Sequence, residues 1–296
     1  MDETAWLAAR FEEHRSHLRA VAYRMLGSVP EADDAVQEAW LRFNRSDTSG
    51  VGNLAGWLTT VVARVCLDTL RTRRSRREEP LGAQAPAAAA GARDRGDPEQ
   101  EAVLADSVGL ALLVVLETLA PDERLAFVLH DMFAVPFEDI ATLVGRSPTA
   151  ARQLASRARR RVRGTDTPRR RDLHRQRAVV EAFLAAARAG DFEALLAVLD
   201  PDVVRRVDGH GLPPGAPREL RGAVVVARAA LGGSQRARAA PVALARVDGA
   251  VGVVVAPRGR LAMAIRFTIG GGRIRAIDVI TDPARLRALD VAVLQG

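Results

Sequence analysis

Residues 134–163 form the stretch that most constrains the fold of this 296-residue chain. Apolar residues recur there at helical spacing up to Val144, and Gly145 can then adopt the left-handed conformation that ends a helix. Ser147 is a suitable N-cap, and Pro148 fits the first position of a second helix. Two helices joined by a glycine turn predict a helix-turn-helix, whose second helix can enter the major groove of DNA.

The second helix of this motif has two different faces. Small and apolar residues at helical spacing predict its buried face: Ala151, Leu154, Ala155 and Ala158. The polar residues between them point outward, close to the end of the helix that reaches base edges: Arg152, Gln153, Ser156 and Arg157. We expect these four residues to bind DNA. A plain αα-hairpin is the alternative at this point, because such patterns also arise by chance.

The charge of the chain supports a nucleic-acid partner. The formal net charge is +7, and all 43 basic residues are arginine, whose planar guanidinium suits phosphates and guanine edges. The single cysteine, Cys66, excludes an intrachain disulfide and lies in an apolar helical run, so we expect a small core residue rather than a reactive thiol. The N-terminus lacks the layout of a signal peptide, and the apolar runs are too short to span a bilayer, which predicts a cytoplasmic protein without a membrane partner.

Residues 3–43 predict two helices separated by the sequence Gly27–Pro30. Apolar residues mark the buried stripes: Trp6, Phe11, Leu18, Val21, Ala22 and Met25 in the first helix, and Ala32, Ala35, Val36, Ala39 and Trp40 in the second. The second helix also carries an exposed acidic face: Asp33, Asp34, Gln37 and Glu38. From spacing alone this face is best interpreted as compensation of the helix dipole.

A polar loop, Asn44–Asn53, separates these helices from a third, which spans residues 54–77. This third helix finishes in a cluster of arginines: Arg64, Arg71, Arg73, Arg74, Arg76 and Arg77. Two arginines would satisfy the dipole at a helix end, so the larger number favours binding to phosphates. The stretch 78–100 is rich in Ala, Gly and Pro without an apolar period, which predicts a flexible linker.

Beyond Asp172 the sequence predicts a separate α+β domain. Two helices, 175–188 and 192–199, precede runs rich in β-branched residues: 203–207, 242–247, 251–256, 261–269 and 273–281. The sequences 247–251 and 269–273 are suited to hairpin turns. Asp208 and His210 form an acid and imidazole pair that could transfer protons, but their Gly- and Pro-rich setting indicates a loop. We find no metal-ligand spacing, phosphate loop or nucleophile elbow, and therefore predict no catalytic residue, metal or cofactor.

Three parts of the chain resemble one known family. Residues 11–43 paired with 56–78 resemble the σ2 domain of extracytoplasmic-function (ECF) sigma factors, and residues 119–162 resemble their σ4 domain. The tail, with FLAAARAGDFEALLAVLDPDVV (183–204) and DGHG (208–211), is similar to a SnoaL-like cone. The order is that of the subgroup with a C-terminal SnoaL-like extension. The resemblance implies two all-α domains, a σ2 helical bundle and a σ4 helix-turn-helix, followed by an α+β cone. The expected boundaries are 1–79, a linker at 80–100, 101–165 and 172–296.

The resemblance also implies roles for particular residues. The acidic face Asp33, Asp34, Gln37 and Glu38 matches the surface that binds the clamp helices of the RNA polymerase β′ subunit, which replaces the dipole interpretation. The loop from Asn44 to Asn53 matches the segment that captures a flipped −10 base. The part that contacts the melted −10 strand is matched by Trp57 and by the arginines Arg71, Arg73 and Arg74. From the residues alone, Trp57 is better interpreted as a core residue. The helix with Arg152 and Gln153 matches the reader of the −35 element. The polymerase β flap is a further implied partner.

These implications predict an alternative sigma factor without catalytic activity, which directs core RNA polymerase to promoter DNA and is regulated in cis by its extension. A small apolar ligand in the cone is a further partner that we consider. The sequence departs from the subgroup after the arginine-rich helix, where Glu79-Pro80 stands for a longer linker motif, and at Thr281–Leu286, which stands for an NPDKL-like segment. Two alternatives remain: a DNA-tethered SnoaL-type enzyme and a ligand-sensing transcription regulator.

Overall fold

The computed structural model describes residues 3–46, 51–78, 109–164, 170–208, 215–236, 241–257 and 260–294. The chain divides into two compact units, which are described separately below. The N-terminal unit contains Met1–Val108 and Leu119–Arg159, and the C-terminal unit contains Gly109–Thr118 and Arg160–Gly296. The predicted linker at 80–100, residues 47–50 of the predicted loop and His210 lie outside the described residues.

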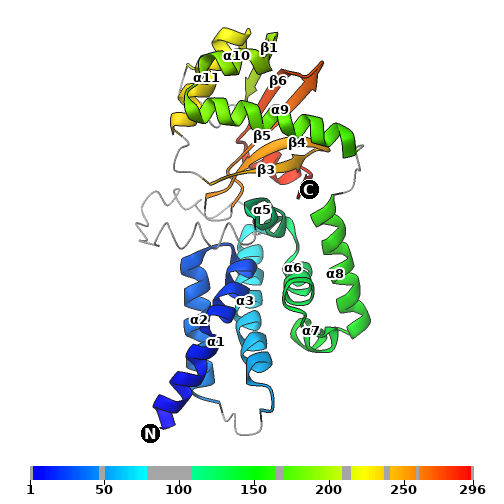
Figure 1. Cartoon of the computed structure of the whole chain (residues 1–296). Helices are drawn as coiled ribbons and strands as arrows, with labels where there is room; N and C mark the ends of the chain where they lie inside the picture. Colours follow the sequence, from blue (N-terminus) through cyan, green and yellow to red (C-terminus); the bar gives the residue numbers. More distant parts are fainter. Residues whose placement is uncertain are drawn as a thin grey trace. The chain divides into compact units, whose positions relative to one another are not determined.

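The described part of the N-terminal unit is helical, as predicted (Figure 1). Three long helices come first: α1 (Glu3–Leu26), α2 (Val29–Phe43) and α3 (Leu54–Glu78). Shorter elements follow after residue 119: α6 (Pro121–Phe127), the π-helical turn η1 (Val128–Met132), α7 (Phe137–Val144) and α8 (Pro148–Arg163), which continues into the C-terminal unit. The predicted break between the first two helices is confirmed at Gly27 and Ser28, and Pro30 lies in the first turn of α2.

The predicted buried stripes form the core of the three long helices. The described side chains of the first stripe are all buried: Phe11, Leu18, Val21, Ala22 and Met25. In α2 the alanines and Val36 are buried as well, whereas Trp40 is half-buried with its ring 5.2 Å from that of Phe11. Cys66 is fully buried, and this burial raises the pKa of its thiol to about 12. The prediction that Cys66 is a core residue is confirmed.

The helix-turn-helix also forms as predicted. Gly145 follows α7 with a left-handed φ of 67°, which a residue with a Cβ rarely adopts. The hydroxyl of Ser147 accepts a hydrogen bond of 3.2 Å from the amide of Ala150, so Ser147 caps α8. The four residues predicted to face inward from α8, Ala151, Leu154, Ala155 and Ala158, are all buried.

The C-terminal unit is built on one mixed sheet. Its helices are α5 (Leu110–Thr118), α9 (Arg170–Ala189), α10 (Phe192–Val198), α11 (Ala223–Arg236) and α12 (Pro283–Ala288). Its strands are β1 (Leu199–Val207), β2 (Glu219–Arg221), β3 (Val242–Val247), β4 (Ala250–Val255), β5 (Met263–Gly270), β6 (Arg273–Ile280) and β7 (Val291–Ala292). The strand order is β2-β1-β6-β5-β4-β3-β7, in which β1 and β6 are parallel and the other pairs are antiparallel.

The five predicted strands are confirmed, although β1 begins at Leu199 rather than at residue 203. Both predicted hairpin turns are confirmed too. Asp248 and Gly249 have φ angles of 48° and 82° between β3 and β4, and Gly271 and Gly272 have angles of 61° and 79° between β5 and β6. Paired positive φ angles give the tight turns that match the twist of the strands. The short strands β2 and β7 and the helices α11 and α12 were not predicted.

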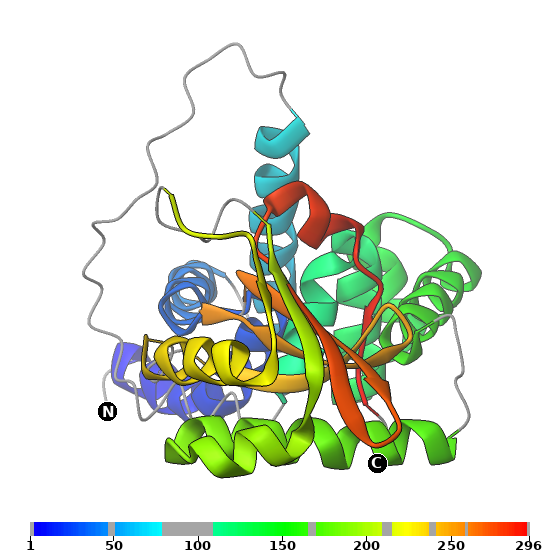
Figure 2. The ribbon, with the colours of Figure 1, turned by 90° about the horizontal axis from the view of Figure 1, so that it is seen from above.

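The two faces of this sheet carry different apolar clusters. On the inner face, which α9, α10 and α11 cover, buried residues of β1, β4, β5 and β6 form one core. Phe183 of α9 and Phe267 of β5 meet there with ring centroids 5.5 Å apart. Figures 1 and 2 show α9 running alongside the sheet, with α10 and α11 next to it.

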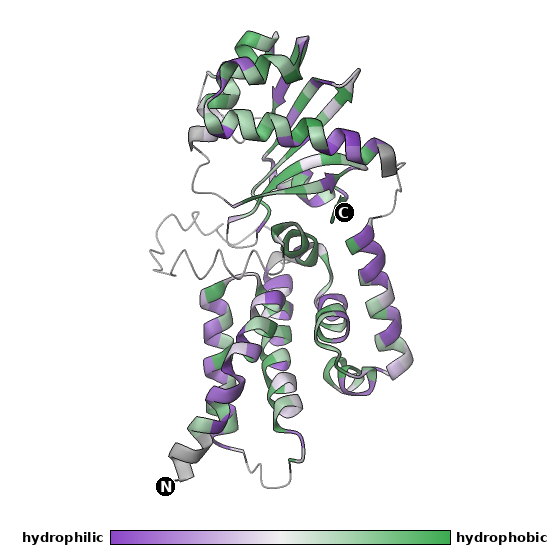
Figure 3. Cartoon of the chain, viewed as in Figure 1, coloured by the Kyte–Doolittle hydropathy of each residue, from purple (hydrophilic) through white to green (hydrophobic). Residues whose placement is uncertain are grey.

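The outer face is covered by α5, the helix that precedes the helix-turn-helix region in the chain. Leu110, Ala111, Val114 and Val115 of α5 share an apolar cluster with buried residues of β3, β4, β5, β6, α12 and β7. Almost the whole of α5 is hydrophobic (Figure 3). Polar contacts add to this packing, because Glu117 accepts a hydrogen bond of 3.2 Å from the amide of Leu261.

This packing differs from the expected domain boundaries. The sequence assigns residues 101–165 to one DNA-binding domain, whereas the structure places Gly109–Thr118 and the end of α8 in the C-terminal unit. At that end the amide of Val293 donates to the carbonyl of Val162 at 3.1 Å. The physical reason is the continuous apolar character of α5, which the outer face of the sheet buries.

Candidate nucleic-acid interface

The outer side of α8 presents the four residues that the sequence predicts to bind DNA. Arg152, Gln153, Ser156 and Arg157 are all exposed, one helical turn apart in two pairs. Arg152 pairs with Glu138 of α7 at 3.1 Å, and its guanidinium lies 5.4 Å from the ring centre of Phe137. Both partners of this ion pair are more than half exposed, so the pair contributes little stability and can be exchanged for a DNA contact.

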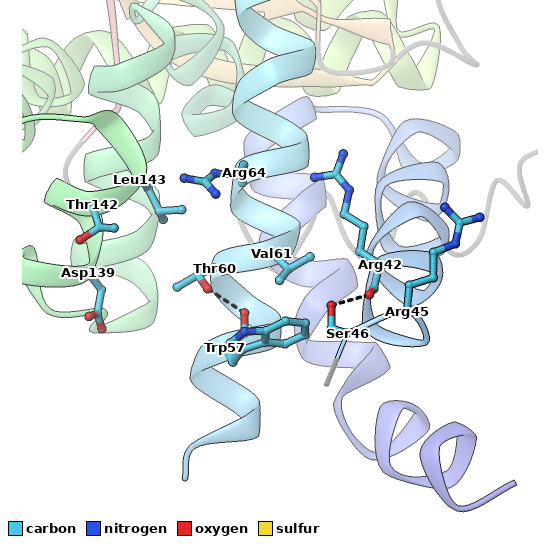
Figure 4. A pocket seen from close by; sticks show the side chains of 10 residues that line it. All are labelled: Arg42, Arg45, Ser46, Trp57, Thr60, Val61, Arg64, Asp139, Thr142 and Leu143. Atoms are coloured by element: carbon cyan, nitrogen blue, oxygen red, sulfur yellow. Dashed lines mark hydrogen bonds between the residues drawn. The ribbon is translucent and has the colours of Figure 1, made fainter. Parts of the chain in front are cut away.

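A basic groove of about 630 Å³ lies between the long helices and α7 (Figure 4). Its lining comes from three places: Arg42, Arg45 and Ser46 at the end of α2, Trp57, Thr60, Val61 and Arg64 of α3, and Asp139, Thr142 and Leu143 of α7. A lining with one tryptophan and three arginines combines a stacking surface for bases with positive charge for the phosphates. The groove is therefore suited to a single nucleic-acid strand.

Trp57 is half-buried rather than a core residue, with its ring 5.9 Å from that of Phe43 and one side toward the groove. Arg42 lies outside every site predicted from the sequence, and Arg45 belongs to one only as part of the loop from Asn44 to Asn53. The sequence does place both arginines where α2 ends and the polar loop begins. Only the fold shows that α3 and α7 complete a groove with them.

The two asparagines at the edges of the predicted loop have different environments. Asn44 is exposed at the end of α2. Asn53 is exposed as well, and its side-chain oxygen accepts a hydrogen bond of 2.9 Å from the amide of Gly56. Asn53 thus caps the start of α3, a structural task that leaves its amide NH2 group for other partners.

Arginines of both predicted DNA-binding regions converge on two carboxylates at the start of α6. Arg71 donates to Asp122 at 2.9 Å, and Arg157 lies 3.2 Å from Glu123. Together with Arg74 and other residues they line a cleft of about 410 Å³. Arg73 does not join this group, because it pairs with Glu31 of α2. These pairs link residues far apart in sequence, which is why sequence reasoning missed them.

The acidic face of α2 is exposed at Asp33, Asp34 and Gln37, and half-buried at Glu38. Asp33 accepts two hydrogen bonds, of 2.6 and 3.0 Å, from Arg19 of α1. Glu38 pairs with Arg42 at 2.9 Å, one turn further along α2. Both ion pairs are formed at the surface, so they do not remove the face from contact with a partner.

Asp208, the acid considered for proton transfer, has a structural role in the fold. Its carboxylate accepts hydrogen bonds of 2.9 Å from the amides of Thr281 and Asp282, and another from the Thr281 hydroxyl. Burial alone would raise the pKa of Asp208, but these hydrogen bonds and the charge of Arg285 together hold its pKa below the usual value. A carboxylate held ionised in this way is a weak general base.

Replacing Asp208 by asparagine is expected to destabilise the C-terminal unit by about 2 kcal/mol at neutral pH, because charge-assisted hydrogen bonds are lost. Since the folded-state pKa is lowered, the contribution of Asp208 is fully present above the unfolded-state pKa and disappears as the pH falls through the folded-state value. Thermal unfolding of both proteins at several pH values measures this. A difference in Tm that stays constant down to pH 3 would contradict the assignment.

Within the described ranges, no three His, Cys, Asp or Glu side chains gather in a way that could hold a metal ion. Among those same residues, no helix has the length and apolar character needed to cross a bilayer.

Two family descriptions match the chain: Sigma-70 region 2 over residues 10–76, and Sigma-70, region 4 over residues 109–162. The first contains most of α1 to α3, and the second contains α5 to α8 up to Val162. The regions that carry the groove and the helix-turn-helix are therefore those of a sigma-70-type factor.

Individual relatives extend the similarity over most of the chain. Over 288 residues the chain is 41% identical to the ECF RNA polymerase sigma factor SigJ of Mycobacterium tuberculosis (strain ATCC 25618 / H37Rv), covering 93% of this chain and 91% of that protein. Over 228 residues it is 28% identical to the ECF RNA polymerase sigma factor SigG of the same strain, covering 67% and 60%. The crystal structure of the Mycobacterium tuberculosis extracytoplasmic function sigma factor SigJ matches with a TM-score of 0.47 and 38% identity, covering 94% of this chain and 97% of that one.

The chain belongs to the ECF RNA polymerase sigma factors. The family predicted from the sequence, and the order of two helical regions followed by an α+β part, are confirmed.

Proposed function

We propose that this chain binds core RNA polymerase through the acidic face of α2, reads the −10 element with the basic groove and the −35 element with α8, and acts in the cytoplasm. The C-terminal unit regulates these contacts in cis and has no catalytic activity of its own. Polymerase contacts are made with the β′ clamp helices and the β flap. The observation that carries the proposal is that α2 exposes Asp33, Asp34 and Gln37, whereas the groove at its far end is basic.

Each site residue has a role in this proposal. Arg152, Gln153, Ser156 and Arg157 contact −35 DNA, which their exposure on α8 supports. Trp57 stacks against an unpaired base of the −10 strand, and Arg42, Arg45 and Arg64 contact its phosphates. Asn44 and Asn53 border the loop that receives a flipped base. Arg71, Arg73 and Arg74 contact phosphates, and for this Arg71 and Arg73 exchange their carboxylate partners, Asp122 and Glu31, for DNA.

Reversing the charge of Asp34 tests the polymerase contact. In Asp34→Lys the affinity for core polymerase is expected to fall at least about tenfold, because like charges then meet across the interface. The measurement is binding of the full chain to core enzyme, together with run-off transcription from a promoter of this factor. Asp68→Lys is the matched control, since Asp68 is an exposed acid on α3.

Two results would contradict the proposal. The first is a failure of the unchanged chain to bind core polymerase. That result would favour the two alternative functions, a DNA-tethered enzyme or a regulator that acts without replacing another sigma factor. The second is equal affinity of Asp34→Lys and the unchanged chain for core polymerase, which would show that the acidic face of α2 does not contact the polymerase.

A further inference from the structure

The inner face of the C-terminal unit contains a cavity of about 570 Å³ between the sheet, α9 and α11. Most of its lining is apolar, including Leu184, Ala230, Val253, Met263, Ile265 and Ile277. This volume lies within the range of sites that bind small organic molecules, which are also mainly apolar with a few polar groups.

One lining residue does not fit the core pattern of its strand. In β1 the residues Val203 and Val207 are buried in the inner-face cluster, and strand alternation places Arg205 on the same face between them. Its partner in β6 is Ile277, another residue of the cavity. Arg206, the next residue in the strand, lies on the opposite face and pairs with Glu219 at 3.0 Å. Burying a charged group among apolar side chains is costly unless the group has a partner, whereas Arg206 is exposed and keeps its charge in water.

The other polar residues of the lining also carry positive charge or none. Arg188 at the end of α9 and Ser234 of α11 complete the lining, and none of the described residues that line the cavity is acidic. Two guanidinium groups at an apolar cavity attract an anion, and the planar fork of arginine matches a carboxylate in two parallel hydrogen bonds.

We propose that this cavity binds a small amphipathic carboxylate, with its apolar part against the sheet and α11 and its carboxylate at Arg205. The proposal deepens the cis regulation of the proposed function, on which it rests, by giving the C-terminal unit a ligand with an acidic head and a residue that recognises it. Arg205 selects the head group, whereas the valines, Met263 and the isoleucines accept the chain or ring.

Binding of decanoate and of 2-naphthoate to the full chain tests the proposal, with 1-decanol as the neutral analogue. Isothermal titration without polymerase or DNA makes the result independent of the sigma-factor function. We expect at least one of the two carboxylates to bind, and 1-decanol to bind at least about tenfold more weakly than decanoate, because it lacks the charge-assisted contact.

Two pairs of variants locate the site. Arg205→Met is expected to weaken carboxylate binding at least about tenfold and to leave 1-decanol binding unchanged, whereas Arg206→Met is the matched control on the opposite face. Gly233 lines the cavity within α11, and a Cβ placed on it meets no atom within 4 Å. Gly233→Leu should therefore fill the cavity without unfolding the helix and abolish binding, while Gly233→Ala leaves it measurable.

Three results would overturn the proposal. They are the absence of binding by both carboxylates, equal affinities for decanoate and 1-decanol, and retention of carboxylate binding in Arg205→Met or Gly233→Leu. None of these results bears on the proposed binding of polymerase and promoter DNA, so the two proposals fail separately.

Discussion

Replacing Val114 by aspartate is expected to destabilise the C-terminal unit by about 4 kcal/mol, since the new carboxylate is buried without a partner. Val114 is fully buried on α5, in the apolar cluster on the outer face of the sheet. The apolar cluster on the outer face of the sheet includes this helix, so we expect a lower Tm and a less cooperative unfolding transition of this unit. Thermal unfolding followed by circular dichroism measures both.

Val224→Asp is the matched control for this experiment. Val224 is 45% exposed near the start of α11, where a carboxylate also suits the helix dipole. The same chemical change should therefore leave the Tm almost unchanged. If Val114→Asp unfolds at the temperature of the control, α5 is not part of the folded C-terminal unit.

The packing of α5 also affects how regulation by the extension can be studied. A chain that ends at Gly164 lacks every strand of the sheet and so exposes the apolar face of α5. The transcription activity measured with this shortened chain would therefore reflect two changes at once, the loss of regulation and the loss of the sheet against which α5 packs. Variants of the full chain separate these effects.

Replacing Arg152 and Gln153 together by alanine is expected to reduce transcription from a −35-dependent promoter at least about thirtyfold, because each of two bidentate base contacts contributes about 1–3 kcal/mol. Both residues are exposed on α8 beside a fully buried Ala151, so their removal should leave the fold intact. Run-off transcription from the natural promoter and from one with an altered −35 element measures the effect. The variant should discriminate less between the two promoters.

Arg160→Ala is the control, because Arg160 is exposed near the end of α8, away from the end that reaches base edges. Its loss should weaken transcription from both promoters by a similar, smaller factor, as expected for a phosphate contact. Unchanged discrimination in the Arg152 and Gln153 variant would show that another part of the chain reads the −35 element.

Much of this fold could be predicted because its local signals agree with one another. The glycine at position 145, the cap at Ser147 and the spacing of Ala151 and Leu154 all indicate the same two helices. Likewise, Asp248-Gly249 lies between two β-branched runs, and the hairpin forms at this predicted turn.

The features that could not be predicted depend on contacts between distant residues. The short strands β2 and β7 have too few residues for a period, and they exist because β1 and β3 offer them an edge. The helical character of the segment from Leu110 to Leu119 was predictable, but its place against residues beyond 242 was not. The groove beside Trp57 needed α7 to be placed next to α3.

The place of α5 in the C-terminal sheet has a consequence for the synthesis of this protein. Residues 109–118 leave the ribosome long before residues 242–292, which form the strands β3 to β7. Until those strands are made, an almost wholly hydrophobic helix has no sheet to pack against and is a natural target for a chaperone. The nascent chain therefore completes the C-terminal unit only when its last strands are translated, and slow or interrupted translation of this region would favour aggregation.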